Sequence, residues 1–352
     1  MNKIFKLVLG FSAAVLVMSC SVETGQWSAE RAQKWAAEKD WIVGCNYIPC
    51  NAINQIEMWS ASTYDSKLID HELSLAEGLG FNTVRVYLSS VVYLHNPAEL
   101  KDNMNDFLTI ASSHGIKPLF VFFDDCWNAE SSYGIQPAPK PGIHNSGWVQ
   151  DPAASLRQDT TALFQMMEPY VRDILTTFKD DNRILMWDLY NEPGNMKHGS
   201  SSLPLLKKVF EWAQDVRPSQ PLTSGVWRKF KDLNRYQLEN SDVITYHCYK
   251  DGEHQQAAID TLSRFNRPMV CTEYMGRTRN STFQNNMPVL KKNNVGAINW
   301  GFVAGKTNTI YTWDTPMPNG SEPELWFHDI YRQDDTPYSQ EEVDFIIEMT
   351  TK

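Results

Sequence analysis

The chain has 352 residues and a formal net charge of −10. Because surfaces that bind nucleic acids are basic, this acidic balance gives no indication of a nucleic-acid partner. The length suits one large α/β barrel with long loops, and it also suits two domains of average size.

The first twenty residues have the features of a bacterial export signal. Lys3 and Lys6 precede an apolar stretch over residues 7–18, which is too short to span a bilayer. The stretch ends in Val17-Met18-Ser19-Cys20, which resembles the lipobox of bacterial lipoproteins, where the cysteine is lipidated and becomes the mature N-terminus.

We therefore expect residues 1–20 to be a lipoprotein signal peptide, Cys20 to be the lipidation site and residues 21–27 to be a tether. Because Ser21, and not an acidic residue, directly follows Cys20, we expect a lipid anchor in the outer membrane of a Gram-negative bacterium, facing the periplasm or the cell surface. The alternative is an ordinary cleaved signal that ends by chance at this cysteine.

After the tether, a helix is predicted from Ser28, a suitable N-cap residue, to about Lys39. Short apolar runs then alternate with helical segments. Several of these runs are continuous rather than alternating, which is typical of parallel strands buried on both faces. The eight predicted strands are 41–46, 83–88, 117–123, 184–190, 222–227, 243–247, 268–273 and 297–302.

Helical periodicity fills the intervals between these runs. Apolar residues recur every three or four positions from Leu163 to Phe178, from Leu206 to Ala213, and from Ile69 to Ala76 before Gly80. Eight strands alternating with helices predict a single-domain (β/α)8 barrel over residues 28–352. An open doubly wound sheet is the main alternative, but no G-x-G-x-x-G sequence follows the first strand.

Two connections are unusually long. Residues 124–157 follow the third predicted strand and residues 303–337 follow the eighth, and both are rich in aromatic residues. Both loops would emerge at the rim formed by the carboxyl ends of the strands. Because sugar faces stack on flat apolar rings, we expect these loops to build a substrate cleft, although the aromatic residues also suit packing within the loops.

Two glutamates follow predicted strands at this rim. Glu192 lies at the end of the run that precedes Pro193, and Glu273 lies 81 residues later at the end of the seventh strand. Hydrolysis of a glycosidic bond needs a proton donor for the leaving oxygen and a nucleophile or water at the anomeric carbon. Two carboxyl groups brought to one barrel rim therefore indicate glycoside hydrolysis.

Asn191-Glu192-Pro193 after the fourth strand and Glu273 after the seventh resemble the retaining β-glycosidases that carry catalytic glutamates on strands four and seven of a (β/α)8 barrel. The nearest group is glycoside hydrolase family 5, the cellulase-like family, and the resemblance covers about residues 40–350. It implies that Glu192 is the acid/base and that Glu273 is the nucleophile, with no cofactor.

The resemblance extends to five binding positions. Arg85 matches the strand-two arginine that braces the nucleophile, where a cation would lower the nucleophile's pKa. Asn191 matches the asparagine that contacts the sugar 2-hydroxyl, and His247 and Tyr249 match the strand-six His-x-Tyr beside the nucleophile. Trp300 matches the tryptophan that forms the floor of the subsite before the scissile bond.

The chain departs from the family's pattern at the end of the third strand. Phe122-Phe123-Asp124-Asp125-Cys126-Trp127 stands where many relatives have a histidine. Either Asp124 and Trp127 take over the sugar contacts, or the cleft differs here. This departure leaves the identity of the substrate undetermined, but it does not change the predicted reaction.

A metal site is not expected. His114 and His144 lack the short spacing of metal ligands, and the sequence contains no C-x-x-C pair. The five cysteines after Cys20 are an odd number, so they cannot all pair within the chain. The sequence does not decide whether Cys45 and Cys50 form a disulfide.

The predicted function is that of a retaining β-glycoside hydrolase. It would cleave β-linked chains of the mannan, glucan or xylan type through a glycosyl-enzyme intermediate. Two alternatives remain, a lipid-anchored barrel that binds glycans without catalysis and a transglycosylase that uses the same two glutamates. The sequence leaves open the choice between endo and exo action and the oligomeric state.

Overall fold

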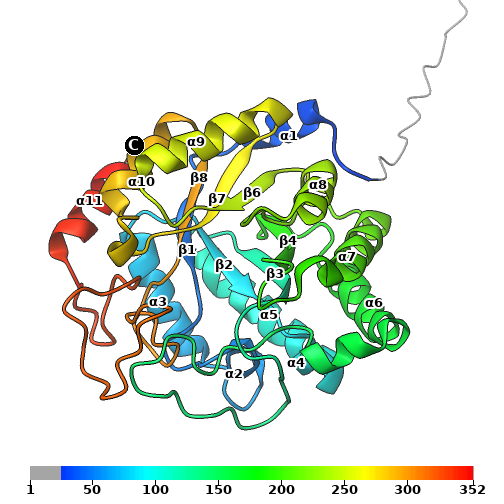
Figure 1. Ribbon diagram of the computed structural model, residues 1–352, viewed down its shortest axis with the longest axis horizontal. Coiled ribbons are helices and arrows are strands. Elements are labelled where there is room, and N and C mark those ends of the chain that lie inside the picture. Colours follow the sequence, from blue (N-terminus) through cyan, green and yellow to red (C-terminus); the bar gives the residue numbers. More distant parts are fainter. Residues whose placement is uncertain (1–24, 352) are drawn as a thin grey trace, which may run out of the picture.

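A computed structural model describes residues 25–351. The predicted signal peptide, Cys20 and the first part of the tether lie outside those residues. Within them, eight parallel strands form one sheet in the order β5-β4-β3-β2-β1-β8-β7-β6, and helices surround it (Figure 1). This arrangement confirms the predicted single-domain (β/α)8 barrel. In the described part of the chain, no helix has the length and apolar composition of a membrane span.

The strands agree with the predicted runs, and seven of them have ends within a few residues of the predicted ones. The strands are β1 (Val43–Asn46), β2 (Thr83–Tyr87), β3 (Leu119–Asp124), β4 (Met186–Asn191), β5 (Leu222–Thr223), β6 (Ile244–His247), β7 (Met269–Tyr274) and β8 (Gly296–Asn299).

The fifth strand is shorter than predicted, because it ends at Thr223 instead of continuing to residue 227. Gln237 Nε2 donates to the carbonyl of Gly225 at 2.6 Å, so a side chain occupies an acceptor that a neighbouring strand would otherwise use. Val226 then forms an isolated parallel bridge with Tyr246. The barrel therefore closes between β5 and β6 through one bridge instead of a ladder.

The helices begin and end where the sequence signals place them. Ser28 accepts a hydrogen bond from the backbone N of Arg31 at the start of α1, and Asp65 caps α3 in the same way. Gly80, just past the end of α3, has a φ of +72°. The helices are α1 (Ala29–Ala37), α2 (Gln55–Trp59), α3 (Ser66–Gly78), α4 (Ser90–His95), α5 (Pro97–Ser113), α6 (Thr160–Thr177), α7 (Leu203–Val216), α8 (Lys231–Asn240), α9 (Gly252–Leu262), α10 (Phe283–Lys292) and α11 (Gln340–Thr350).

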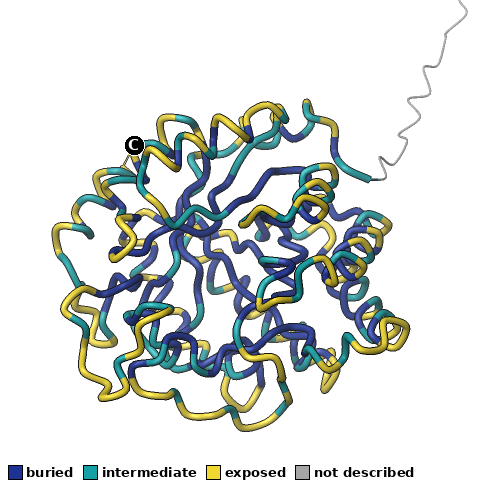
Figure 2. The backbone as a smooth tube through the Cα atoms, viewed as in Figure 1, coloured by how far each residue is buried: buried dark blue, intermediate teal, exposed yellow. Residues whose placement is uncertain are grey.

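The strands are almost entirely buried (Figure 2). Their apolar side chains belong to two separate cores. The larger core lies between the strands and the helices, and side chains such as Val84 and Val86 contribute to it from β2. The smaller core fills the barrel interior, where Leu119, Val121 and Ile298 meet. Alternate residues of one strand thus face opposite cores, which fixes Arg85 and Tyr87 on the inner face.

The five described cysteines are all free. Cys45 and Cys271 lie in β1 and β7 and are fully buried, as expected of cysteine used as a small apolar residue. Cys50 forms no bridge with Cys45. The bridge that the sequence left open is therefore absent from the described residues.

The last part of the predicted tether lies against the barrel. Trp27 is 2% exposed, and its backbone N donates to Asp242 Oδ1 at 2.6 Å. Gln26 Nε2 donates to the carbonyl of Ser241 at 2.6 Å. Because burial of a large aromatic ring stabilises a fold, these two residues belong to the folded domain and not to a tether.

Replacement of Trp27 by alanine should therefore destabilise the domain. We expect the Trp27→Ala variant to lose about 3–5 kcal/mol of unfolding free energy, because it leaves a cavity and removes buried apolar surface. Urea denaturation measures this loss, with Ile135→Ala as control because Ile135 is fully exposed. A loss below about 1 kcal/mol for Trp27→Ala would show that this segment is only loosely attached.

Candidate active site

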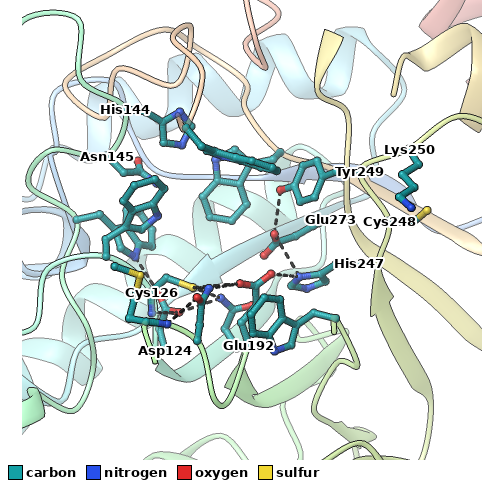
Figure 3. Close-up of a pocket in the computed structure, with 18 of the residues that line it drawn as sticks. Asp124, Cys126, His144, Asn145, Glu192, His247, Cys248, Tyr249, Lys250 and Glu273 are labelled. Carbon is teal, nitrogen blue, oxygen red and sulfur yellow. Dashed lines mark hydrogen bonds and ion pairs between the residues drawn. The ribbon is translucent and has the colours of Figure 1, made fainter. Parts of the chain in front are cut away.

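The carboxyl ends of the strands surround a cavity of about 690 Å³. Glu192 follows the last residue of β4, and Glu273 lies near the end of β7. The side chains of both glutamates face this cavity, together with those of His247 and Tyr249 (Figure 3). The two predicted catalytic residues therefore meet at one rim of the barrel, as parallel strands require.

Glu192 sits on a sharp turn of the chain. Its φ is +43°, a left-handed value that is uncommon outside glycine, and Pro193 follows directly. Asn195 Nδ2 donates to Oε2 at 2.6 Å, and Nδ1 of His247 lies 2.8 Å from Oε1. Burial raises the pKa of Glu192 to about 7, against the opposing effect of hydrogen bonds from Cys126 and Asn195. A carboxyl group in this setting can hold a proton near neutral pH.

Glu273 accepts hydrogen bonds on both oxygens. Arg85 Nη1 donates to Oε1 at 2.9 Å, Tyr87 OH donates to the same oxygen at 3.2 Å, and Tyr249 OH donates to Oε2 at 2.9 Å. Burial raises the pKa of Glu273 from its ordinary value, and the opposing effect of Arg85 is smaller. The lowered pKa expected from the sequence is therefore wrong.

Arg85 is fully buried and holds several site residues in place. Its Nη2 donates to Asp188 Oδ2 at 2.8 Å and to Asn191 Oδ1 at 2.7 Å, while Nη1 donates to Asn46 Oδ1 at 2.8 Å. Asp188 is also fully buried, so it balances the charge of Arg85 below the cavity. This planar cation therefore fixes Asn191 and Glu273 relative to each other.

The two glutamates lie close together beside His247. One carboxylate oxygen of each glutamate and a ring nitrogen of His247 all lie within 4.8 Å of one another, a spacing that could hold a metal ion. Burial lowers the pKa of His247 to about 4, so its ring is neutral at pH 7 and Nδ1 carries the hydrogen that faces the carboxylates. The short carboxylate separation fits the geometry of retaining glycosidases, about 5–5.5 Å between carboxyl groups.

Asp124 lines the cavity but is only 1% exposed. Asn191 Nδ2 donates to Oδ1 at 2.9 Å, and Trp148 Nε1 donates to Oδ2 at 2.7 Å. Burial raises the pKa of Asp124 to about 7. Because both of its oxygens already accept hydrogen bonds within the protein, Asp124 is better placed to orient Asn191 and Trp148 than to contact a sugar.

Trp127 and Trp300 both line the cavity, as the sequence predicted. Trp127 has a φ of +69° and lies over the ring of His144, with 5.2 Å between ring centroids. Trp300 packs edge-on against Tyr87 and Trp148, at 6.0 and 5.9 Å. The cavity thus has flat aromatic walls next to the two carboxyl groups, which suits a sugar ring.

Trp148 and Trp313, from the two long aromatic loops that were expected to build the cleft, also line the cavity. Sequence reasoning missed other residues of this cavity or of the network beneath it, namely Asn46, Tyr87, Cys126, His144, Asn145, Asp188, Asn195 and Trp227. A usable signal existed for Tyr87, because it lies two positions after Arg85 and so shares its face of β2. The loop residues have no such signal, because their positions depend on contacts between distant loops.

Comparisons with known proteins agree with this geometry. The family model for cellulase (glycosyl hydrolase family 5) matches residues 47–305, which is most of the chain. No curated protein sequence matches the chain.

Solved structures share the fold at low sequence identity. An exo-β-1,4-mannosidase from Opitutaceae bacterium strain TAV5 is 16% identical with a TM-score of 0.61; the match covers 88% of this chain and 59% of the mannosidase, so the chain spans less than two thirds of that protein. GH5_18 from Streptomyces cattleya, solved with GlcNAc, is 13% identical with a TM-score of 0.60, over 88% of this chain and 80% of that one.

A third solved structure, an endo-β-1,4-mannanase from Thermotoga petrophila, is 13% identical with a TM-score of 0.55, over 90% of this chain and 77% of that one. At these identities the structures support the barrel fold alone. The family assignment rests on the matched family model, which covers strands β2 to β8 together with both glutamates. The chain therefore belongs to glycosyl hydrolase family 5 and is a glycosidase.

Proposed function

We propose that the protein is a retaining β-glycoside hydrolase in which Glu273 is the nucleophile and Glu192 is the acid/base. The observation that carries this proposal is the pair of carboxyl groups, which lie within 4.8 Å of each other in unlike surroundings. Glu273 accepts hydrogen bonds from Arg85 and two tyrosines, which suits a carboxylate. Glu192 has a pKa of about 7, which suits a proton donor.

The reaction proceeds in two displacements. A carboxylate oxygen of Glu273 bonds to the anomeric carbon while the bond to the leaving oxygen breaks, and Glu192 gives its proton to that oxygen. Glu192, now ionised, takes a proton from water as the water oxygen attacks the anomeric carbon. The bond between Glu273 and the sugar then breaks, and both carboxyl groups return to their starting states.

The substrate we propose is a β-linked polysaccharide or oligosaccharide of the mannan, glucan or xylan type. The aromatic side chains that line the cavity beside Glu273 favour a sugar ring at the reaction centre. Two of the structures with the same fold are named as a β-1,4-mannosidase and an endo-β-1,4-mannanase, so mannans are tested first.

A panel of β-1,4-mannan, xylan and glucan, together with aryl β-glycosides, tests this function. We expect the wild type to release sugar from at least one of them. The Glu192→Ala variant should retain activity mainly toward aryl glycosides with acidic leaving groups, which need no proton donor, and azide should restore its second step by forming a glycosyl azide. A wild type that hydrolyses none of them would instead favour a glycan-binding barrel without catalysis.

A transglycosylase with the same residues would form the same intermediate. It would transfer the sugar to an added saccharide acceptor instead of to water. Product analysis with and without the acceptor separates these two reactions, and we expect free sugar as the main product in both mixtures.

The pH dependence follows from the pKa of Glu192. The first step needs Glu192 protonated, and with a pKa of about 7 the protonated form disappears as the pH rises above this value. We therefore expect kcat/KM to fall above about pH 7. The hydrogen bond from Asn195 favours the ionised form of Glu192 and so lowers its pKa. In Asn195→Ala the pKa of Glu192 should rise, and the fall in kcat/KM should move to higher pH. A fall that stays in place or moves to lower pH would argue against Glu192 as the acid.

We also propose that the chain is exported and anchored to a membrane through a lipid on Cys20. The support is the sequence before this cysteine, which lies outside the described residues. Labelling of the expressed protein with a radioactive fatty acid tests the proposal. We expect label in the wild type and none in Cys20→Ser, whereas equal labelling of the two would contradict it.

A further inference from the structure

The loop after β3 carries two buried polar side chains that lack partners among the described residues. Both amide atoms of Asn145 and Nε2 of His144 have no hydrogen-bond partner there, although the two residues are only 1% and 3% exposed. Both residues line the cavity that contains Glu192 and Glu273 (Figure 3). Because buried polar groups are normally hydrogen-bonded, groups left open toward a substrate cavity indicate that a ligand completes them.

The two side chains are held in place by the loop after β8. Nδ1 of His144 lies 2.8 Å from the carbonyl oxygen of Tyr311, so Nδ1 carries the hydrogen and Nε2 is left as an acceptor. Burial lowers the pKa of His144 to about 4, so the ring is neutral. The backbone N of Asn145 donates to the carbonyl of Thr307 at 2.7 Å, and Asn145 has a φ of +47°. Hydrogen bonds to the loop after β8 therefore fix the position of this turn.

The same turn closes one side of the cavity. The backbone N of Met317 donates to the carbonyl of Gly142 at 2.9 Å, which joins the loops after β3 and β8. Ring contacts then run from Trp127 to His144 at 5.2 Å and from His144 to Trp313 at 6.5 Å. Trp313 packs on Tyr249, which donates to Glu273. These contacts form a wall from the loop after β3 to the nucleophile. In Figure 3, His144 and Tyr249 lie on the side of the cavity away from Glu192.

We propose that His144 and Asn145 bind hydroxyl groups of the terminal sugar unit, and that the joined loops close the cavity behind that unit. Nε2 of His144 accepts from one hydroxyl, and the amide of Asn145 both donates and accepts, as neighbouring sugar hydroxyls require. The enzyme then removes single sugar units from a chain end and does not cut within the chain. This inference rests on the proposed function, since the terminal unit is the one that Glu273 attacks.

The Asn145→Gly variant tests the binding role, because glycine keeps the left-handed backbone and removes only the amide. Asn294→Gly is the matched control, since Asn294 is exposed and has a φ of +52°. Binding of β-1,4-mannotriose, cellotriose and xylotriose is measured by calorimetry in the inactive Glu273→Ala background. For the sugar that wild type hydrolyses, we expect about tenfold weaker binding with Asn145→Gly and less than about twofold change with the control.

The products released by the wild type test whether the enzyme attacks the end of the chain. We expect monosaccharides from the start of digestion of the matching polysaccharide, with a slow fall in viscosity. Early release of long fragments, or unchanged binding by Asn145→Gly, would overturn the inference while leaving the proposed function intact. A wild type that hydrolyses no substrate would overturn both.

A second groove, of about 520 Å³, adjoins this cavity and supports an independent inference. Trp227, Lys229 and His247 line both spaces. Trp227 Nε1 donates to the carbonyl of Pro193 at 3.2 Å, and Pro193 follows Glu192. Because the proposed acid Glu192 faces the leaving group, this groove extends from the leaving-group side of the site.

The groove is strongly basic, although the chain has a net charge of −10. Glu239 is a carboxylate that also lines it. The N-terminus of α8 opens here without a side-chain cap, which adds partial positive charge. Five exposed cations that form no ion pair within residues 25–351 line the groove, namely Arg228, Lys229, Lys231, Arg235 and Arg264.

We infer that this groove binds an anionic sugar unit of the substrate, carrying a carboxylate or a sulfate ester. Unpaired cations beside a neutral reaction centre would raise the local concentration of such a substrate and hold its charged unit. The inference rests on the proposed function, because the unit is part of the leaving group.

Sets of oligosaccharides that differ only in whether the leaving-group unit carries a carboxylate, a sulfate or neither test this inference. We expect wild type to prefer a charged member. We expect Arg235→Glu, at a cation that lines the groove but not the catalytic cavity, to lower kcat/KM for that member about tenfold while changing the neutral one about twofold or less. Lys179→Glu is the control, since Lys179 is exposed in the connection before β4, at the opposite rim.

The preferred charged member shows which anionic group the groove recognises. Wild-type preference for the neutral member, or equal effects of Arg235→Glu and Lys179→Glu, would overturn the inference. The proposed function would survive either result, because the neutral member would still be hydrolysed.

Discussion

Replacement of Glu273 by glutamine is expected to reduce kcat by about four orders of magnitude or more. Glutamine has nearly the same shape and can still accept the hydrogen bond from Tyr249 OH, so the fold should persist. Its amide cannot attack the anomeric carbon, and no other described carboxylate accepts hydrogen bonds from both Arg85 and Tyr249. Single-turnover and steady-state rates on the best aryl glycoside measure the loss.

The control for this variant is Glu72→Gln. Glu72 is also a buried glutamate, and it accepts hydrogen bonds from Tyr47 OH and the backbone N of Cys50, away from the cavity. We expect Glu72→Gln to retain activity within a few-fold of wild type. If Glu273→Gln kept more than about 1% of wild-type kcat, Glu273 would not be the nucleophile.

Replacement of Arg85 by methionine is expected to destabilise the protein by about 3–5 kcal/mol, because it leaves the charge of Asp188 buried without its partner. Activity should also fall, since Glu273 and Asn191 both lose a charged hydrogen bond. The midpoint of urea unfolding measures the first effect, and kcat/KM measures the second.

The double variant Arg85→Met/Asp188→Asn separates these two effects. It removes both charges, so part of the lost stability should return. Activity should not return, because Glu273 still lacks the cation beside Oε1. A single variant that loses less than about 1 kcal/mol, or a double variant that is no more stable than the single one, would contradict this role for the buried pair.

Much of the fold and of the reaction centre could be predicted from the sequence, for a physical reason. Parallel strands place their carboxyl ends at one rim, so residues that follow the fourth and seventh strands, Glu192 and Glu273, must come together. Apolar runs of strand length are also read directly from the sequence. Arg85 follows the same logic, because its position on the inner face of β2 is set by the alternation of side chains.

Features that depend on contacts between distant segments could not be predicted. The end of β5 depends on Gln237, which takes up the carbonyl of Gly225. Trp27 was assigned to a tether because its partner, Asp242, lies far along the chain. Asn145 was missed because its place in the cavity depends on a hydrogen bond to the other long loop, at Thr307.

The departure at Asp124 illustrates the same limit. Asp124 lies at the end of β3, as the sequence predicted, but its hydrogen-bond partners were not predicted. Trp148 and Asn191 each donate a hydrogen bond to one of its oxygens, so the Asp124 carboxyl group orients these two residues beside the cavity. The identity of a residue therefore predicts its place at the rim more reliably than its role there.

The anomeric form of the first product tests the central claim most directly. Proton NMR follows hydrolysis of a β-linked substrate in deuterated water, at a rate faster than mutarotation. Double displacement through Glu273 predicts that the β-anomer appears first and that the α-anomer forms only as the sugar equilibrates. Initial release of the α-anomer would show a single displacement by water and would contradict the proposed mechanism.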